Sequence, residues 1–266
     1  MPHVRPAAVA GRFYPAQPSA LLHQLDDFIA PARETSSWPK VLIAPHAGYI
    51  YSGPIAGQAY ALLRAARGQI SRVVLLGPAH FVRLRGLALP EAEAFATPLG
   101  TVPVDMDAVR AIADLPQVIR ADAPHAPEHS LEVHLPFLQH MLDGFSVVPL
   151  VVGDATYEAV AEVIERLWGG PETLIVISTD LSHVLDYATA RALDAQTAEA
   201  IEALQPEAIR YEQACGRTPL GGLLQLARQR GMRIERLDLR NSGDTAGPRD
   251  QVVGYGAWAL YEESPA

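Results

Sequence analysis

The chain has 266 residues, of which 49% are hydrophobic and 19% charged, so it can form a sizeable core and does not have the composition of a disordered protein. It carries 21 lysines and arginines against 30 aspartates and glutamates, a net charge of −9. This balance argues against a nucleic-acid partner, because proteins that bind nucleic acid usually carry a basic face. The single cysteine, Cys215, excludes an intrachain disulfide framework and a four-cysteine zinc site.

The sequence gives no sign of a membrane association. The first residues lack the long apolar run of a signal peptide, and no stretch approaches the ~20 apolar residues that cross a bilayer. With one cysteine and no export signal, we expect a soluble protein of the cytoplasm.

Short runs rich in valine, isoleucine and leucine predict buried strands, and longer segments with helical spacing alternate with them. The expected strands are Lys40–Ala44, Arg72–Leu76, Ser146–Val152, Leu174–Ser178, Ile234–Leu239 and Val252–Leu260. The expected helices are Ile55–Ala66, Met106–Ile112, Leu131–Leu142, Tyr157–Trp168, Ala188–Leu204 and Leu220–Arg230. This alternation predicts an α/β fold, one domain over residues 1–266 with a mostly parallel central sheet flanked by helices. Residues 83–103 are expected to form an antiparallel excursion or a lid.

Polar residues follow the expected strands at the point where each strand ends. His46 follows the first strand and His80 the second, whereas Asp180 and His183 follow LIVIS. Ligands of open α/β sheets bind beyond the carboxyl ends of the strands, so these side chains are expected to converge. Imidazole is both the commonest side-chain metal ligand and the usual general base. Further polar residues are expected to line the site or to support it: Asn241 and Ser242 after the IERLDLR strand, and Tyr51 near His46.

A second histidine cluster lies in HAPEHSLEVHLPF, residues 125–137. Helical spacing would place His129 and Glu132 on one face, lining or supporting the site, while His134 would point away from it. The cluster lacks the HExxH pattern of zinc proteases.

Cys215 stands just before an apolar helical stretch, in YEQACGRTPLGG. A lone cysteine is commonly an inert buried residue. Near a helix N-terminus, with Arg217 close by, its thiol pKa would instead be lowered, which favours a nucleophile or a soft metal ligand.

Seven strings in chain order resemble the Memo family, whose bacterial and archaeal members are called AmmeMemoRadiSam system protein B. They are RPAAVAGRFYP, APHAGYIYSG, LLGPAHF, PEHSLEVHLPFLQ, ISTDLSH, ACGRTPL and NSGDTAGPRDQVVGYGAWAL. The resemblance covers nearly the whole chain and implies a fold similar to the class III extradiol dioxygenases, whose iron is held by two histidines and a glutamate.

The resemblance also implies a ligand set. His46 and His80 stand where the two metal-binding histidines lie, and Cys215 stands in place of the dioxygenase carboxylate. Asp180 and His183 match the family's site Asp and His, and His183 resembles the acid/base histidine. Two histidines with a thiolate form a softer site than two histidines with a carboxylate, one that suits copper or zinc and still accepts iron.

Three hypotheses remain open from the sequence. The first is a metal-dependent oxidoreductase holding iron or copper at His46, His80 and Cys215, in which His183, oriented by Asp180, moves protons. The second is a binding module on a dioxygenase-like scaffold. The family name points to AMMECR-type and radical-SAM proteins as its partners, beside an unknown small-molecule ligand. The third is a metal-free hydrolase with Cys215 as nucleophile and His46 or His183 as base.

Overall fold

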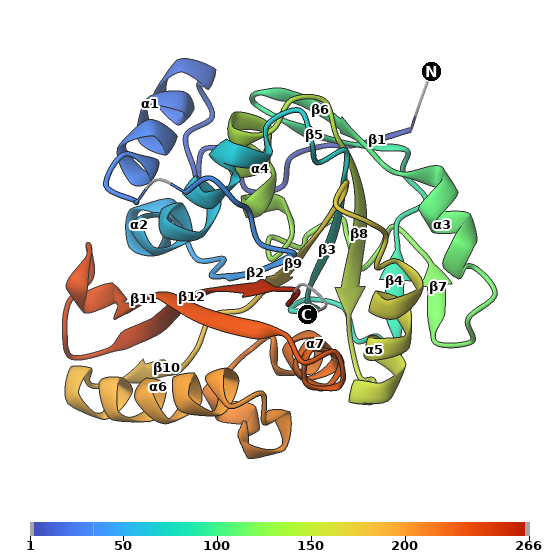
Figure 1. The fold of residues 1–266 in the computed structure, drawn as a ribbon. Coiled ribbons are helices and arrows are strands. Elements are labelled where there is room, and N and C mark those ends of the chain that lie inside the picture. Colours follow the sequence, from blue (N-terminus) through green and yellow to red (C-terminus); the bar gives the residue numbers. More distant parts are fainter. Residues whose placement is uncertain (1–2, 34, 264–266) are drawn as a thin grey trace.

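Four parallel strands form the centre of the nine-stranded sheet (Figure 1). In the computed structural model, which describes residues 3–33 and 35–263, these strands lie side by side in the order β2 (Val41–Ala44), β9 (Thr173–Ser178), β3 (Arg72–Pro78) and β8 (Ser146–Val152). All residues of β2 and β9 are buried, because helices cover both faces of the sheet. The predicted α/β fold with a central sheet flanked by helices is therefore confirmed.

The sheet as a whole is mixed, because its flanks are built from antiparallel pairs. On one side β12 (Val252–Tyr261) runs antiparallel to β2, and both β11 (Arg233–Asn241) and β10 (His183–Leu185) run antiparallel to β12. On the other side β4 (Leu87–Leu89) is antiparallel to β8 and parallel to β7 (Val118–Arg120). The parallel arrangement predicted for the sheet thus holds for its centre.

The region 83–103 supplies three short strands. Besides β4 it contains the antiparallel hairpin of β5 (Ala94–Thr97) and β6 (Gly100–Pro103), which joins β1 (Val4–Arg5) in a separate three-stranded sheet. The structure confirms the antiparallel excursion expected there.

One face of the central sheet is covered by α1 (Pro18–Ile29), α2 (Tyr49–Tyr60) and α4 (Leu135–Met141), together with the 3₁₀ segments η1 (Ala61–Ala66) and η2 (Glu132–His134). The first helix was not predicted, although Pro18 at its start is a typical helix-initiating residue. The second begins at Tyr49, before the expected Ile55, and its backbone touches α1. A Cβ atom on Gly57 would lie 2.3 Å from the Phe28 carbonyl oxygen, so only glycine permits this approach.

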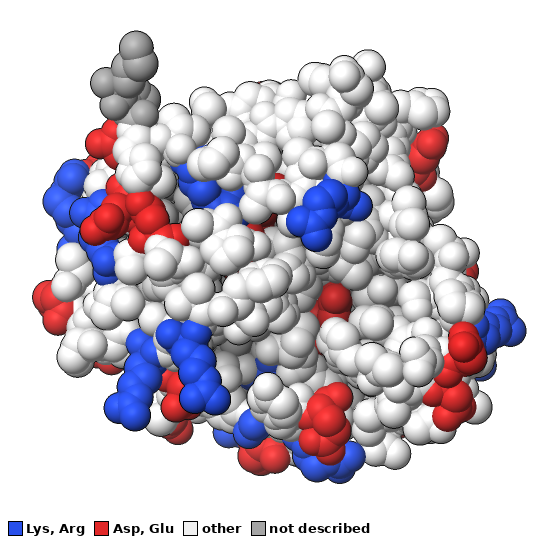
Figure 2. Space-filling view, turned by 180° about the vertical axis from the view of Figure 1, so that it is seen from behind, with Lys and Arg blue, Asp and Glu red and all other residues white. Residues whose placement is uncertain are grey.

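The opposite face is covered by α5 (Tyr157–Arg166), α6 (Tyr187–Glu202) and α7 (Arg217–Gln229), with α3 (Met106–Ile112) against α5. Three further 3₁₀ turns are η3 (Pro206–Ala208), η4 (Tyr211–Gln213) and η5 (Ser242–Asp244). Among the described residues no helix combines the length and the apolar character needed to span a bilayer. Figure 2 shows one face of the molecule, on which basic and acidic side chains lie next to one another in small groups, most of them mixed, between wide uncharged areas.

Candidate metal centre

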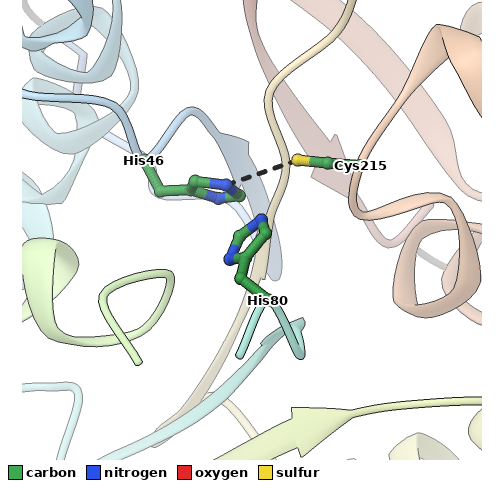
Figure 3. A group of neighbouring side chains, drawn as sticks. All are labelled: His46, His80 and Cys215. Carbon is green, nitrogen blue, oxygen red and sulfur yellow. Dashed lines mark hydrogen bonds between the residues drawn. The ribbon is translucent and has the colours of Figure 1, made fainter. Parts of the chain in front are cut away.

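His46, His80 and Cys215 come together at the carboxyl edge of the central sheet. His46 follows the end of β2, His80 follows the end of β3, and Cys215 lies just before α7. One ligand atom from each residue lies within 4.8 Å of the other two. Figure 3 shows the three side chains pointing toward one another from three different segments. The expected convergence of residues that are far apart in the sequence is therefore observed.

A close backbone contact positions Cys215. A Cβ atom on Gly216 would lie 2.4 Å from the carbonyl oxygen of Ser178, so glycine allows the start of α7 to approach the end of β9. The Cys215 sulfur then lies 3.3 Å from His46 Nε2 and accepts a hydrogen bond from the Asp180 amide at 3.3 Å.

The environment of Cys215 raises the pKa of its thiol to about 12, contrary to the lowered pKa expected from its place before a helix. Burial is the main cause, and the neighbouring Asp180 carboxylate adds to it. These two effects raise the pKa by more than the helix N-terminus lowers it, because the free-energy cost of removing the thiolate from water exceeds the stabilisation by the partial positive charge of the helix end. Little of the thiol is therefore ionised in the metal-free chain at neutral pH, whereas a bound cation would displace the thiol proton.

We expect iodoacetamide to alkylate Cys215 in the metal-free, folded chain about a thousandfold more slowly than a free thiol at neutral pH, because a pKa of about 12 leaves little thiolate. The rate is measured by mass spectrometry against the same chain unfolded in urea, which has the same single cysteine. Because the raised pKa lies above the working range, the rate should rise about tenfold per unit of pH. Equal rates in the folded and unfolded chains would refute the raised pKa.

A hydrogen-bond chain behind His46 sets the tautomer of its ring. The Ser178 hydroxyl donates to the Ser130 carbonyl at 2.6 Å, so it must accept from His46 Nδ1 at 2.6 Å and from His134 Nε2 at 2.8 Å. The Tyr60 hydroxyl then donates to His134 Nδ1 at 2.7 Å. His46 therefore carries its proton on Nδ1 and presents the lone pair of Nε2 to Cys215. Burial and the nearby histidines hold the pKa of His46 well below its usual value, so the ring is neutral, as a metal ligand requires.

Glu128 performs the corresponding role for His80 and was not identified from the sequence. Its carboxylate accepts hydrogen bonds from His80 Nδ1 at 2.9 Å and from the His80 amide at 2.7 Å. Burial alone would raise the pKa of Glu128, but hydrogen bonds from His80 and the Ser130 amide lower it to about 2. The ionised carboxylate thus holds the His80 proton on Nδ1 and leaves Nε2 free. The only indication of this role in the sequence is that Glu128 is an acidic residue directly before His129.

His129, which was expected to line or support the site, lies beside His80. Its ring stacks on that of His80, with centroids 4.7 Å apart and an interplanar angle of 12°. Burial, and second the electrostatic coupling to the neighbouring His80 ring, lower the pKa of His129 to about 4. His129, Glu128 and His80 also form a second group of closely spaced ligand atoms, so His129 is available beside the centre.

Asp180 and His183 do not form the predicted pair. Asp180 accepts a hydrogen bond from the His46 amide at 2.8 Å, and its other carboxylate oxygen lies 3.9 Å from His46 Nε2. Burial raises the pKa of Asp180 to about 6, against the lowering effect of that amide. His183 is exposed, and its Nδ1 bonds to the Leu181 carbonyl at 2.8 Å. The backbone, rather than Asp180, therefore orients His183.

The prediction for Glu132 and His134 was wrong, because the helix expected over both residues begins only at Leu135. Glu132 is fully buried and its carboxylate is occupied by the N-terminal segment, accepting from Arg5 Nη1 at 2.7 Å and from the Tyr14 hydroxyl at 2.7 Å. Its role is therefore to anchor that segment. His134 is a packed histidine, as expected, but its Nε2 contacts Ser178 behind His46 instead of pointing away.

The polar groups of Asn241, Ser242 and Tyr51 form hydrogen bonds with the loop after β11 or within it. The Asn241 side chain accepts from the Gly243 amide and the Ser242 hydroxyl from the Val253 amide, while the Tyr51 carbonyl accepts from Thr245. The end of β11 is separated from β2 by β12, so Asn241 and Ser242 lie two strands from the end of β2, whereas Tyr51 lies in the first turn of α2. Their described hydrogen bonds stabilise the turn and do not reach His46, His80 or Cys215.

Comparisons with known proteins identify the family of this chain. A sequence model of the Memo-like protein family matches residues 5–259. A MEMO1 family protein of Archaeoglobus fulgidus is 37% identical over 95% of this chain and 97% of its own length. A MEMO1 family protein of Thermotoga sp. strain RQ2 is 38% identical over 94% and 97%.

A solved structure supports the fold alone. The crystal structure of an uncharacterized protein from Escherichia coli K12 covers 84% of this chain and 100% of its own, with a TM-score of 0.54 and 13% identity. The family match over most of the chain and the identities above 30% to full-length relatives establish that this chain belongs to the Memo-like family.

Proposed function

We propose that this chain binds one iron or copper ion through His46 Nε2, His80 Nε2 and Cys215 Sγ, and that it acts as a metal-dependent oxidoreductase. The observation that carries the proposal is the orientation of the two imidazoles. Each has its Nδ1 engaged from behind, His46 by Ser178 and His80 by Glu128, so that both Nε2 lone pairs face the sulfur.

The donor set fits a first-row transition metal. Imidazole and thiolate suit copper, iron and zinc, and three protein ligands leave coordination positions open for a small molecule. The metal would supply electron transfer. Among the chain's own residues, the buried His46 would exclude water and His129 would line the site. His183 would exchange protons with solvent at its Nε2, which has no hydrogen-bond partner among the described residues. A cytoplasmic location is part of the proposal, because a thiolate ligand is best preserved in a reducing compartment.

Metal content tests the proposal. After anaerobic reconstitution with Fe(II) or copper, elemental analysis should find one ion per wild-type chain and almost none in His46→Ala, His80→Ala and Cys215→Ser. His140→Ala is the matched control, because this histidine pairs with Asp26 on the surface. A metal-free wild type, or equal loading of all four variants, would rule out this centre.

Oxidoreductase activity needs a separate measurement. With ascorbate as reductant, the metal-loaded wild type should consume oxygen faster than loaded bovine albumin, and Cys215→Ser should not. Metal binding without any turnover would leave a metal protein that is not an oxidase.

The exposed apolar side chains favour a binding module as the second candidate. Four large ones lie close in sequence to site residues: Ile50, Phe81, Val184 and Tyr211. We propose AMMECR-type and radical-SAM proteins as its partners. Co-purification of these proteins with the wild type, lost in Phe81→Ser, would support this function, and its absence would count against it.

A further inference from the structure

A cleft lined by three arginines adjoins Cys215. It encloses about 740 Å³, between the loop of residues 78–85, the turn of residues 152–154 and the segment 211–219. This volume is within the range of small-molecule pockets. Arg83, Arg85 and Arg217 line it, while Asp154 is its only acidic lining residue.

No carboxylate neutralises these three guanidinium groups among the described residues, and that of Arg217 lies over the Tyr157 ring, with its Cζ 5.7 Å from the ring centroid. Over the part of the chain that the structure describes, none of them forms an ion pair with a carboxylate, although most arginines of the protein do. The Nε atom of Arg217 is enclosed and has no hydrogen-bond partner among the described residues. A buried donor without an acceptor costs free energy, which an anionic ligand would recover.

The surroundings of Arg217 favour an anion further. Arg217 is the first residue of the 13-residue helix α7, whose positive end therefore opens into the cleft, and no side chain caps that end. Tyr211, which is 83% exposed, offers an aromatic face on the same wall. A local positive cleft of this kind attracts anions although the whole chain carries a charge of −9.

We propose that this cleft binds the carboxylate or phosphate group of a small-molecule ligand, through Arg217 and Arg85, directly beside Cys215. The proposal deepens the proposed function, because the rest of such a ligand would reach the metal centre. The cleft itself requires no metal, so the anion site can be tested in the metal-free protein.

The test is calorimetric titration of the metal-free full chain with inorganic phosphate and, separately, with succinate at fixed ionic strength. We expect binding of at least one probe, weakened about tenfold or more in Arg217→Gln and in Arg85→Gln, because each variant loses a charge-assisted hydrogen bond. Arg191→Gln is the control, since Arg191 is an exposed arginine on α6 that contacts Tyr187 and is not a lining residue. Circular dichroism verifies the fold of each variant, and the exposed Arg85 is the safer position should Arg217→Gln be unstable.

The outcomes separate the two proposals. Binding of phosphate alone identifies a phosphate-bearing ligand, and binding of succinate alone a carboxylate; either supports the cleft. No binding of either probe, or equal weakening in Arg191→Gln, overturns it. Binding that is seen only in the metal-loaded protein, with the same affinity in Arg217→Gln and Arg85→Gln, means that the probe coordinates the metal directly. This result also overturns the proposed anion site. Both arginine variants should still load metal, so failure of the metal centre would be visible independently.

Discussion

Replacement of Glu132 by alanine is expected to lower the free energy of unfolding by about 3–5 kcal/mol, because it leaves a buried guanidinium without its counter-charge. The Glu132 side chain is completely buried, and the Arg5 side chain is only 5% exposed. The same carboxylate accepts from the Ala8 amide at 2.8 Å and the Val9 amide at 3.0 Å, so the variant also leaves two backbone donors unpaired. Urea unfolding monitored by circular dichroism measures the change.

A surface ion pair provides the control for Glu132. Glu212→Ala removes a carboxylate that pairs with Arg210 on the surface, where both side chains are exposed, and we expect the unfolding free energy to remain nearly unchanged. If both variants had the same midpoint as the wild type, the buried carboxylate would not be anchoring the N-terminal segment.

Glu128→Gln is expected to weaken metal binding about 10- to 100-fold, the usual effect of losing a partner that orients a histidine ligand. The amide keeps the size of the carboxylate but removes the charge that holds the His80 proton on Nδ1. His80 Nε2 would then be free as a lone pair for only part of the time. Competition with a chelator of known affinity measures the dissociation constant.

Two further variants define what the Glu128 result means. Ser178→Ala should weaken metal binding in the same way through His46, because it removes the acceptor for His46 Nδ1. Glu202→Gln, which alters a partly buried carboxylate paired with Arg236, should leave metal affinity unchanged. Unchanged affinity in both Glu128→Gln and Ser178→Ala would show that the rings are held by their packing alone.

Local patterns were sufficient to place His46 and His80. Apolar runs bounded by proline and glycine predict β2, β3 and β9, and parallel strands present their carboxyl ends at one edge, so residues directly after them must lie near one another. The same reasoning was misleading for Asn241. It treated β11 as another strand whose carboxyl end lies beside those of β2 and β3. In the structure β12 lies between β11 and β2, so the end of β11 is farther from the candidate metal centre. Strand order depends on long-range pairing, which no local pattern contains.

The sequence by itself determined the α/β fold and the central strands, because short-range hydrophobic periodicity contains that information, and the resemblance of its motifs to the Memo family implied the three residues of the candidate metal centre. The tertiary structure alone decided how these residues are tuned. The pKa of Cys215 depends on burial and on Asp180, which is 35 residues away in the chain. These two effects raise the pKa by more than the helix terminus indicated by the sequence lowers it. The tautomers of His46 and His80 depend on Ser178 and Glu128, which reach them only through the folded chain. Desolvation and hydrogen-bond geometry are properties of neighbours in space, and sequence spacing does not specify them.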